Sequence, residues 1–181
     1  MPLSDREIWM KLEAGSLVID PMPDVTQVGP ASIDLCLGAI VHLFKDVPPG
    51  FGPIRLKEAS PTRIVDFVTE TWDLRARPLT LNRGDFAIGY TNEDVQLPTH
   101  LSARVEGRSG FARLGLTIHN TAPTIHPGFR GKIALELHNN GHMALQLEPG
   151  IIICQLIIEN LGRPAAAGYS GVFQNQSGPT S

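Results

Sequence analysis

Glycine and proline interrupt this chain at short intervals, and their spacing is the feature that most limits how it can fold. The 181 residues include 18 glycines and 15 prolines. Both favour turns, because glycine adopts positive φ without strain and proline lacks a backbone donor. The apolar runs between them are short, which is typical of a mainly β domain. A chain of this length is sufficient for one domain with a substantial core.

One helix is expected at the N-terminus, over residues 4–15. Ser4 and Glu7 have the spacing of a capping box, in which each side chain binds the other residue's backbone N–H. An apolar stripe that includes Ile8 follows, and Gly15 can end the helix.

The next segments predict strands and one exposed excursion. Residues 31–44 alternate apolar and polar side chains, which indicates strands broken at Gly38. Residues 46–63 are rich in proline, glycine and charge, and we expect them at the surface. Residues 63–74 fit a strand and a helix equally well.

Two later segments share one pattern. Residues 79–88 and 145–154 both read L-x-L-x-x-G followed by a strand-like run. Each is expected to form a strand, a tight turn and a second strand. Two such hairpins suit an antiparallel barrel or jelly roll.

Charge and cysteine content exclude several classes of protein. The net charge of −3 gives no global attraction to nucleic acid or to an anionic membrane. No apolar run is long enough to span a bilayer, and the first ten residues lack a signal-peptide core. Cys36 and Cys154 lack metal-ligand spacing, and a disulfide framework is not expected. These features predict a cytoplasmic protein.

The central segment carries two arginines around a short predicted helix. Ser109 is expected to cap this helix, which would stop near Gly115. Arg108 and Arg113 supply donors suited to a phosphate or to a carboxylate partner. Short helices with arginines are common, so this pattern alone does not define a site.

Glu136 lies within an apolar strand and allows two interpretations. Alternation places Ile133, Leu135 and Leu137 on one face of the strand and Glu136 on the other. The simpler interpretation is that Glu136 faces solvent on a half-buried strand. The functional interpretation is a general acid or base in a sheltered pocket. Periodicity does not separate the two.

Several catalytic motifs are absent from the sequence. It contains no H-x-E with P-C-x-x-C, so the ligands of a zinc-dependent nucleobase deaminase are missing. It also lacks the phosphate-binding P-loop, the G-x-S-x-G nucleophile motif and the H-E-x-x-H zinc motif.

Longer stretches resemble a known family. "GRSGFARLGL" (107–116), "HNTAPTIHPGFRG" (119–131) and "IALELHN" (133–139) are similar to the dCTP deaminase family of the dUTPase-like superfamily. "GPASIDLCLG" (29–38) and the tail "GYSGVFQNQSGPT" (168–180) also match it. The resemblance covers nearly the whole chain in order.

The resemblance implies a mainly β, dUTPase-like distorted barrel or jelly roll with an N-terminal helix and a short central helix. It implies a homotrimer with active sites at the subunit interfaces. Residues 1–168 would form one domain, and residues 169–181 a flexible tail that closes over the nucleotide. The implied activity is deamination of dCTP to dUTP and ammonia without zinc, in the supply of dUMP and dTTP.

The resemblance also implies roles for individual residues. Glu136 matches the carboxylate that takes a proton from water and protonates cytosine N3. Ser109 and the Ala122 backbone match the partners of that water, and Arg113 matches the arginine beside them. Mg²⁺ would be carried by the triphosphate, and dTTP could act as a feedback inhibitor. The nucleotide-binding positions implied are Arg108, Gly110, His126, Ala134, Leu135, Tyr169 and Gln176.

Three departures from the family pattern keep alternatives open. One is that "RSGFA" (108–112) resembles the dUTPase form of the motif more than the deaminase form. His126 stands where the family has an aspartate that contacts the sugar, and Val172 stands where the tail carries a lysine. A dUTPase would need that aspartate and would lack Glu136, so deamination is favoured. The alternatives are a bifunctional enzyme that forms dUMP from dCTP, a dUTPase, and a non-catalytic nucleotide-binding relative.

Overall fold

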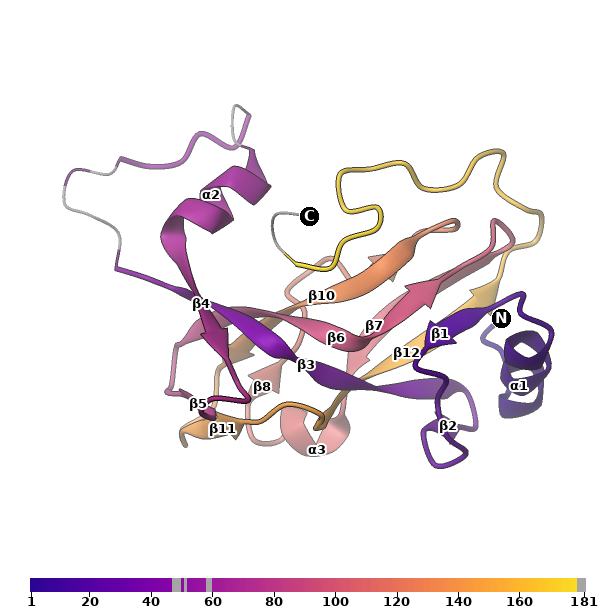
Figure 1. Cartoon of the computed structure of the whole chain (residues 1–181), viewed down its shortest axis with the longest axis horizontal. Coiled ribbons are helices and arrows are strands. Elements are labelled where there is room, and N and C mark those ends of the chain that lie inside the picture. The colour runs from indigo at the N-terminus through magenta and orange to yellow at the C-terminus, as the bar shows by residue number, and fades with distance from the viewer. Residues whose placement is uncertain (47–49, 51, 58–59, 179–181) are drawn as a thin grey trace.

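Within the part of the chain that the structure describes, the fold is a curled, mainly antiparallel sheet with three short helices at its margins (Figure 1). The computed structural model describes residues 1–46, 50, 52–57 and 60–178. The helices are α1 (Asp5–Glu13), α2 (Pro61–Val68) and α3 (Ser109–Ala112). The strands are β1 (Val18–Asp20), β2 (Val28–Gly29), β3 (Ser32–Phe44), β4 (Thr69–Asp73), β5 (Leu79–Leu81), β6 (Phe86–Gln96), β7 (Leu101–Gly107), β8 (Leu116–Thr117), β9 (Thr124–Ile125), β10 (Arg130–Asn139), β11 (Leu145–Leu147) and β12 (Ile152–Asn160).

Strand β3 joins the two halves of the main sheet. The strand order is β8-β10-β6-β3-β12-β7-β9. The first part of β3 pairs with β12 between Ile33 and Cys36, and its later part pairs with β6 and β4. Because one strand changes partners along its length, the sheet curls around a shared core. The predicted β class and barrel-like shape are confirmed.

The predicted break at Gly38 is wrong, because β3 continues through it. A Cβ atom at Gly38 would lie 3.1 Å from the Tyr90 carbonyl oxygen and 3.3 Å from that of Thr91. Glycine therefore permits β3 to approach β6 closely, at the point where the register between them shifts. Gly38 therefore marks a close approach of two backbones and not the end of a strand.

The two segments with the shared pattern do not form two hairpins. Each contains two strands, but β5 pairs with β11 in a separate two-stranded sheet, with Leu79 opposite Leu147 and Leu81 opposite Leu145. The following strands, β6 and β12, join the main sheet. The two similar segments thus pair with each other.

The N-terminal helix is confirmed, together with its capping box. Ser4 accepts from the Glu7 backbone N–H, and the Glu7 carboxylate accepts from the Ser4 backbone N–H at 2.8 Å. Gly15 follows the helix with a φ of 65°.

The ambiguous segment 63–74 contains both predicted structures, because α2 runs directly into β4. Within the excursion 46–63, residues 46, 50, 52–57, 60 and 63 are exposed as expected. The rest of that prediction falls on residues outside the described side chains, or at the beginning of α2.

The core is one cluster of buried apolar side chains between the faces of the curled sheet. Strand β10 contributes to it by strict alternation. Ile133, Leu135 and Leu137 are at most 2% exposed, while Ala134 and Glu136 are half-buried on the opposite face. The predicted assignment of faces is confirmed.

A buried threonine supplies a hydrogen-bond acceptor where the register between β10 and β6 shifts. The register with β6 shifts between Lys132 and Ala134. At the shift, the Ile133 backbone N–H donates to the Thr91 hydroxyl at 3.0 Å, and that hydroxyl donates to the Glu93 carbonyl at 2.7 Å. Thr91 thereby replaces a missing ladder bond next to the segment that carries Glu136.

We expect Thr91→Val to lower the free energy of unfolding by about 1–3 kcal/mol, because it leaves the Ile133 N–H buried without a partner. Valine keeps the shape of threonine, so packing changes little. Thr91→Ser is the control; it keeps the hydroxyl and loses one methyl group, about 1 kcal/mol. Urea unfolding measures both. A valine variant as stable as the wild type would contradict the role assigned to the hydroxyl.

Candidate functional site

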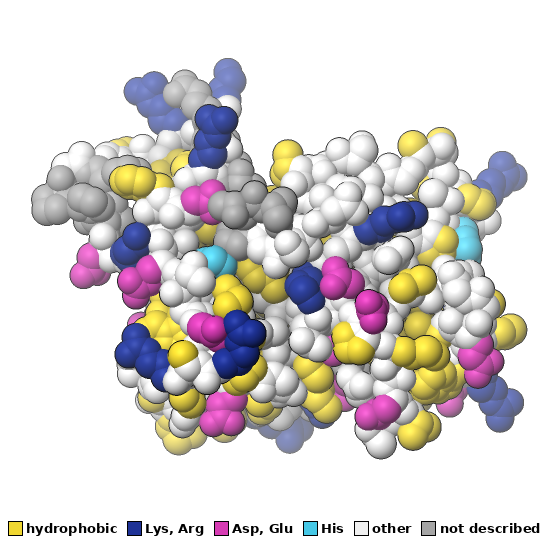
Figure 2. Space-filling view, viewed as in Figure 1, with side chains coloured by type: hydrophobic (Ala, Val, Ile, Leu, Met, Phe, Trp, Pro, Cys, Tyr) yellow, Lys and Arg dark blue, Asp and Glu magenta, His cyan; other side chains and the backbone are white. Residues whose placement is uncertain are grey.

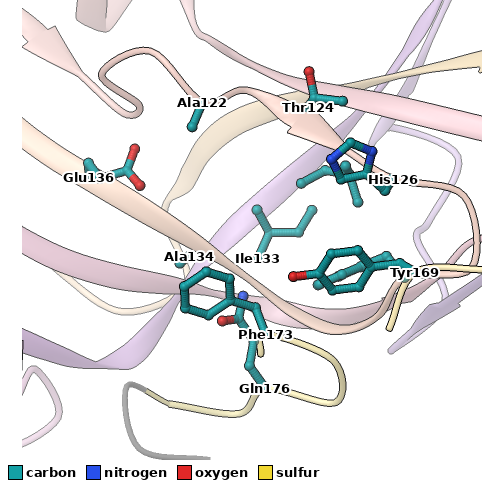
Figure 3. A pocket seen from close by; sticks show the side chains of 11 residues that line it. Ala122, Thr124, His126, Ile133, Ala134, Glu136, Tyr169, Phe173 and Gln176 are labelled. Atoms are coloured by element: carbon teal, nitrogen blue, oxygen red, sulfur yellow. The ribbon is translucent and has the colours of Figure 1, made fainter. Parts of the chain in front are cut away.

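A pocket of about 340 Å³ opens between β10, the segment around β9 and the C-terminal tail (Figure 3). We call it the Glu136 pocket. Its walls are largely apolar, with one carboxylate, one imidazole and a few neutral polar groups. It is lined by Ala122, Thr124, Ile125, His126, Phe129, Ile133, Ala134, Glu136, Tyr169, Phe173 and Gln176.

Glu136 is positioned by β10 and by one backbone hydrogen bond. It stands opposite Ile88 of β6, on the face of β10 away from the core. One carboxylate oxygen accepts from the Asn120 backbone N–H at 3.2 Å. In Figure 3 the carboxylate extends from β10 toward the segment that carries Ala122. Glu136 therefore lines a concave site and does not simply face bulk water.

His126 and Tyr169 form a stacked pair at the other end of this pocket. Their ring centroids are 5.8 Å apart and their planes differ by 9°. The Tyr169 backbone N–H also donates to the Pro127 carbonyl at 2.7 Å. His126 thus contacts the beginning of the C-terminal tail.

The tail then docks along the outer edge of β10. Asn175 N–H donates to the Arg130 carbonyl at 2.7 Å, and Lys132 N–H donates to the Gln176 carbonyl at 2.9 Å. The Gln176 side chain, 6% exposed, donates to the Lys132 carbonyl at 2.7 Å. Gly131 bridges to Gln176 as a short parallel pairing. Residues 169–178 therefore form one wall of the Glu136 pocket.

A second depression, of about 480 Å³, lies beside α3. We call it the Arg108 pocket. Arg108, Ser109 and Gly110 line it together with Gln155 and residues 111, 151 and 152. The Arg108 guanidinium donates to the Asp34 carboxylate at 3.0 Å. The capping prediction is wrong: Arg108 is the N-cap residue, Ser109 is the first residue of α3, and no side chain caps the helix.

The two pockets divide the predicted site residues between them. The Glu136 pocket holds Ala122, His126, Ala134, Glu136, Tyr169 and Gln176, and the Arg108 pocket holds Arg108, Ser109 and Gly110. They share no residue. Figure 1 shows α3 at the lower edge of the sheet and the C-terminal tail above β10.

Two predicted residues line neither pocket. Arg113 is exposed at the end of α3. The Leu135 side chain is fully buried in the core, so a nucleotide contact at this position would have to use the backbone. Alternation along β10 requires this, because Leu135 lies between the two pocket-facing residues Ala134 and Glu136.

Several residues in or beside the two pockets were not predicted from the sequence. Asn120 contributes through its backbone N–H, which any residue except proline could supply, and Phe173 lies in a segment with no strand or helix pattern, so neither was predicted. Asp34 and Gln155 are neighbours only across β3 and β12, where they are register partners. A sequence pattern does not reveal such a pair without the strand register.

Neither cysteine has the environment of a reactive thiol, and both are unpaired. Burial and the nearby Glu93 carboxylate raise the pKa of Cys36 to about 11. Burial likewise raises the pKa of Cys154. Reactivity requires the thiolate, so both stay protonated near neutral pH.

Within the described residues, no group of three or more His, Cys, Asp and Glu side chains could hold a metal ion. The same part of the chain contains no helix long and apolar enough to cross a membrane. Acidic and basic side chains are interspersed over the body of the face shown in Figure 2, so neither sign dominates it.

Solved structures share this fold. The chain superposes on the 2′-deoxycytidine 5′-triphosphate deaminase of Agrobacterium tumefaciens with a TM-score of 0.65 and 24% identity, over 87% of this chain and 47% of that longer one. A mutant dUTPase from phage phi11 of S. aureus gives a TM-score of 0.51 at 14% identity, over 87% of this chain and 98% of that one. The fold is therefore that of the dUTPase-like proteins.

Sequence similarity defines the family more narrowly. Residues 2–161 match the family described as dCTP deaminase-like. A relative named "dCTP deaminase, dUMP-forming" from Dictyoglomus thermophilum is 40% identical, over 99% of this chain and 93% of its own. A relative named "dCTP deaminase" from Halorubrum lacusprofundi is also 40% identical, over 99% of this chain and 89% of its own. The chain belongs to the dCTP deaminase-like family.

Proposed function

We propose that the protein deaminates dCTP hydrolytically to dUTP and ammonia, with its own side chains in place of zinc. The observation that carries the proposal is Glu136, a half-buried carboxylate at the wall of a largely apolar pocket in a chain of this family. In such a pocket it can exchange protons with water and with a pyrimidine ring. The product would enter the supply of dUMP and dTTP.

Glu136 is assigned the general acid/base role. It removes a proton from the water that attacks cytosine C4 and delivers a proton to N3, and later assists the departure of ammonia. General acid/base catalysis of this kind contributes roughly 10²–10⁴-fold in rate. The Asn120 N–H, 3.2 Å from the carboxylate, holds it in orientation. The Ala122 backbone is the proposed second partner of the water.

The remaining catalytic groups are proposed to come from a neighbouring subunit. Ser109 lines the other pocket and Arg113 lines neither, so one chain alone does not surround Glu136 with them. A cyclic homotrimer can place the Arg108 pocket of one subunit against the Glu136 pocket of the next. Ser109 would then hold the water, and Arg113 would lie beside the carboxylate.

The nucleotide would contact groups from both pockets. Arg108 and the Ser109–Gly110 backbone are proposed to bind the triphosphate, while His126, Ala134, Tyr169 and Gln176 contact sugar and base. The Leu135 contribution is restricted to its backbone. Mg²⁺ is proposed to bind to the triphosphate and to neutralise part of its charge, because this ion is commonly bound by phosphate oxygens of the substrate.

A bifunctional enzyme that releases dUMP and pyrophosphate from dCTP is the second candidate. One observation favours keeping it: relatives named with and without "dUMP-forming" are equally similar to this chain, at 40% identity. Loss of the aspartate at position 126 favours deamination alone, because the family's hydrolytic water would lack its holder. We also propose that dTTP inhibits the enzyme by feedback. A cytoplasmic location is proposed as well, and it is compatible with the two free thiols.

Product analysis tests the activity. The protein is incubated with dCTP or dUTP and Mg²⁺, and ammonia and pyrophosphate are measured separately. We expect ammonia alone from dCTP. Both products from dCTP would indicate the bifunctional enzyme, and pyrophosphate from dUTP alone would indicate a dUTPase. The absence of both products would favour a protein that binds nucleotide without catalysis.

Subunit mixing tests the shared site. Ser109→Ala and Glu136→Gln should each inactivate the homotrimer, because each removes a group from all three sites. When the two variants are unfolded together and refolded, mixed trimers should contain some sites with both native residues. We expect partial recovery of ammonia release. No recovery in trimers proven to be mixed would place both residues in the same subunit's site.

A further inference from the structure

Asp34 lies between Arg108 and Gln155 at the margin of the Arg108 pocket. One of its carboxylate oxygens accepts from the Arg108 guanidinium at 3.0 Å, and the other accepts from the Gln155 side-chain amide at 3.1 Å. The Asp34 side chain is 16% exposed, whereas that of Arg108 is 36% exposed. The carboxylate is thus the more sheltered partner of this ion pair.

The orientation of Asp34 is set by the sheet. Asp34 of β3 and Gln155 of β12 are direct register partners. The Gln155 amide also donates to the Ser32 hydroxyl at 3.4 Å. Ser32 lies two residues before Asp34 on β3, so this contact further restrains the Gln155 side chain. Two strands of the main sheet therefore hold the carboxylate in place.

Arg108 lies on less regular backbone, at the residue that precedes α3. Among the side-chain contacts of the described residues, the pair with Asp34 is what orients its guanidinium. An arginine has several rotatable bonds, and a ligand that must order them binds more weakly. One nitrogen is occupied by Asp34, and the remaining N–H donors are left to the pocket.

We infer that Asp34 is a positioning residue, which fixes Arg108 in the orientation that receives the phosphates of the nucleotide. The inference rests on the proposed function, because that function places the triphosphate in the Arg108 pocket. Its physical basis is preorganisation: a guanidinium held before binding loses less conformational freedom when phosphate arrives.

An opposing effect makes the sign of the result informative. A carboxylate close to the phosphates repels them, so removal of its charge could strengthen binding instead. The ion pair with Arg108 offsets this repulsion, and preorganisation is expected to dominate. Asparagine keeps the size of Asp34 but cannot accept from both Arg108 and Gln155 with two oxygens.

The experiment uses Asp34→Asn and two readouts. Calorimetry measures the dissociation constant of inorganic tripolyphosphate, and ammonia release gives KM and kcat for dCTP. We expect tripolyphosphate binding to weaken and KM to rise by about 10-fold, equivalent to about 1.4 kcal/mol, with kcat changed by less than threefold. Glu159→Gln is the matched control, because it breaks the Arg104–Glu159 ion pair of 2.9 Å away from either pocket.

A double variant separates positioning from a merely structural role. In an Arg108→Ala background, Asp34→Asn should add nothing to the loss of tripolyphosphate affinity, because the group that it positions is gone. Additive losses, unchanged or stronger binding in Asp34→Asn, or no tripolyphosphate binding by the wild type would overturn the inference. Failure of the proposed function is seen separately, as absence of ammonia from wild-type protein with dCTP.

Discussion

Glu136→Gln should lower the rate of ammonia release from dCTP by at least 10²-fold and up to about 10⁴-fold. Glutamine keeps the size of the side chain and can still accept from the Asn120 N–H, so the pocket keeps its shape. It cannot take a proton from water or deliver one to the ring. We therefore expect the dissociation constant for dCTP to change by less than about threefold, a limit that calorimetry can check.

His138→Gln is the matched control for this variant. His138 lies two residues further along the same face of β10, and its ring packs edge-on against Phe86, outside the Glu136 pocket. Its substitution should leave turnover close to that of the wild type. If Glu136→Gln turned over dCTP within tenfold of the wild type, the general acid/base role assigned to the carboxylate would be wrong.

Gly131→Ala should detach the C-terminal tail from β10 and raise the KM for dCTP by about tenfold or more. Gly131 has a φ of 123°, and a Cβ atom there would lie 2.6 Å from the Gln176 carbonyl oxygen. The methyl group cannot be accommodated while Gln176 stays in place. Loss of this docking removes Gln176 from its place in the pocket wall. Steady-state kinetics measures the effect.

Gly84→Ala controls for backbone strain. Gly84 also has a positive φ, 88°, but nothing lies within 4 Å of a Cβ atom built there. Both alanine variants should lose roughly 1–2 kcal/mol of stability from the unfavourable backbone conformation. Only Gly131→Ala should weaken nucleotide binding. Equal KM values for Gly131→Ala and the wild type would mean that substrate binding does not need the tail at this edge.

The sequence predicted local structure well where a residue pattern corresponds to only one kind of structure. The capping box of α1 and the alternation along β10 both follow from contacts within a few residues, and both are confirmed. Gly38 was misread because glycine has two uses, as a break and as a point of close approach. The pairing of β5 with β11 was missed because it depends on distant segments.

The candidate site was predicted from the resemblance far more than from patterns. Alternation left Glu136 with two interpretations, and only the pocket formed with the tail and the β9 segment distinguishes them. The Ser109 cap prediction failed because the helix begins one residue earlier than the pattern suggested, with Arg108 at the cap position. Asp34 and Gln155 have no signal without the register of β3 and β12.

Strand β10 serves three neighbours at once: the core on one face, the pocket on the other and the tail along its outer edge. Because side chains alternate, insertion or deletion of a single residue within it would exchange its two faces. The buried apolar face, the carboxylate that faces the pocket and the edge that binds the tail would all be disrupted by one such change. Length variation among relatives should therefore be absent from residues 130–139 and concentrated in connections such as residues 45–60, a pattern that an alignment of the family can refute.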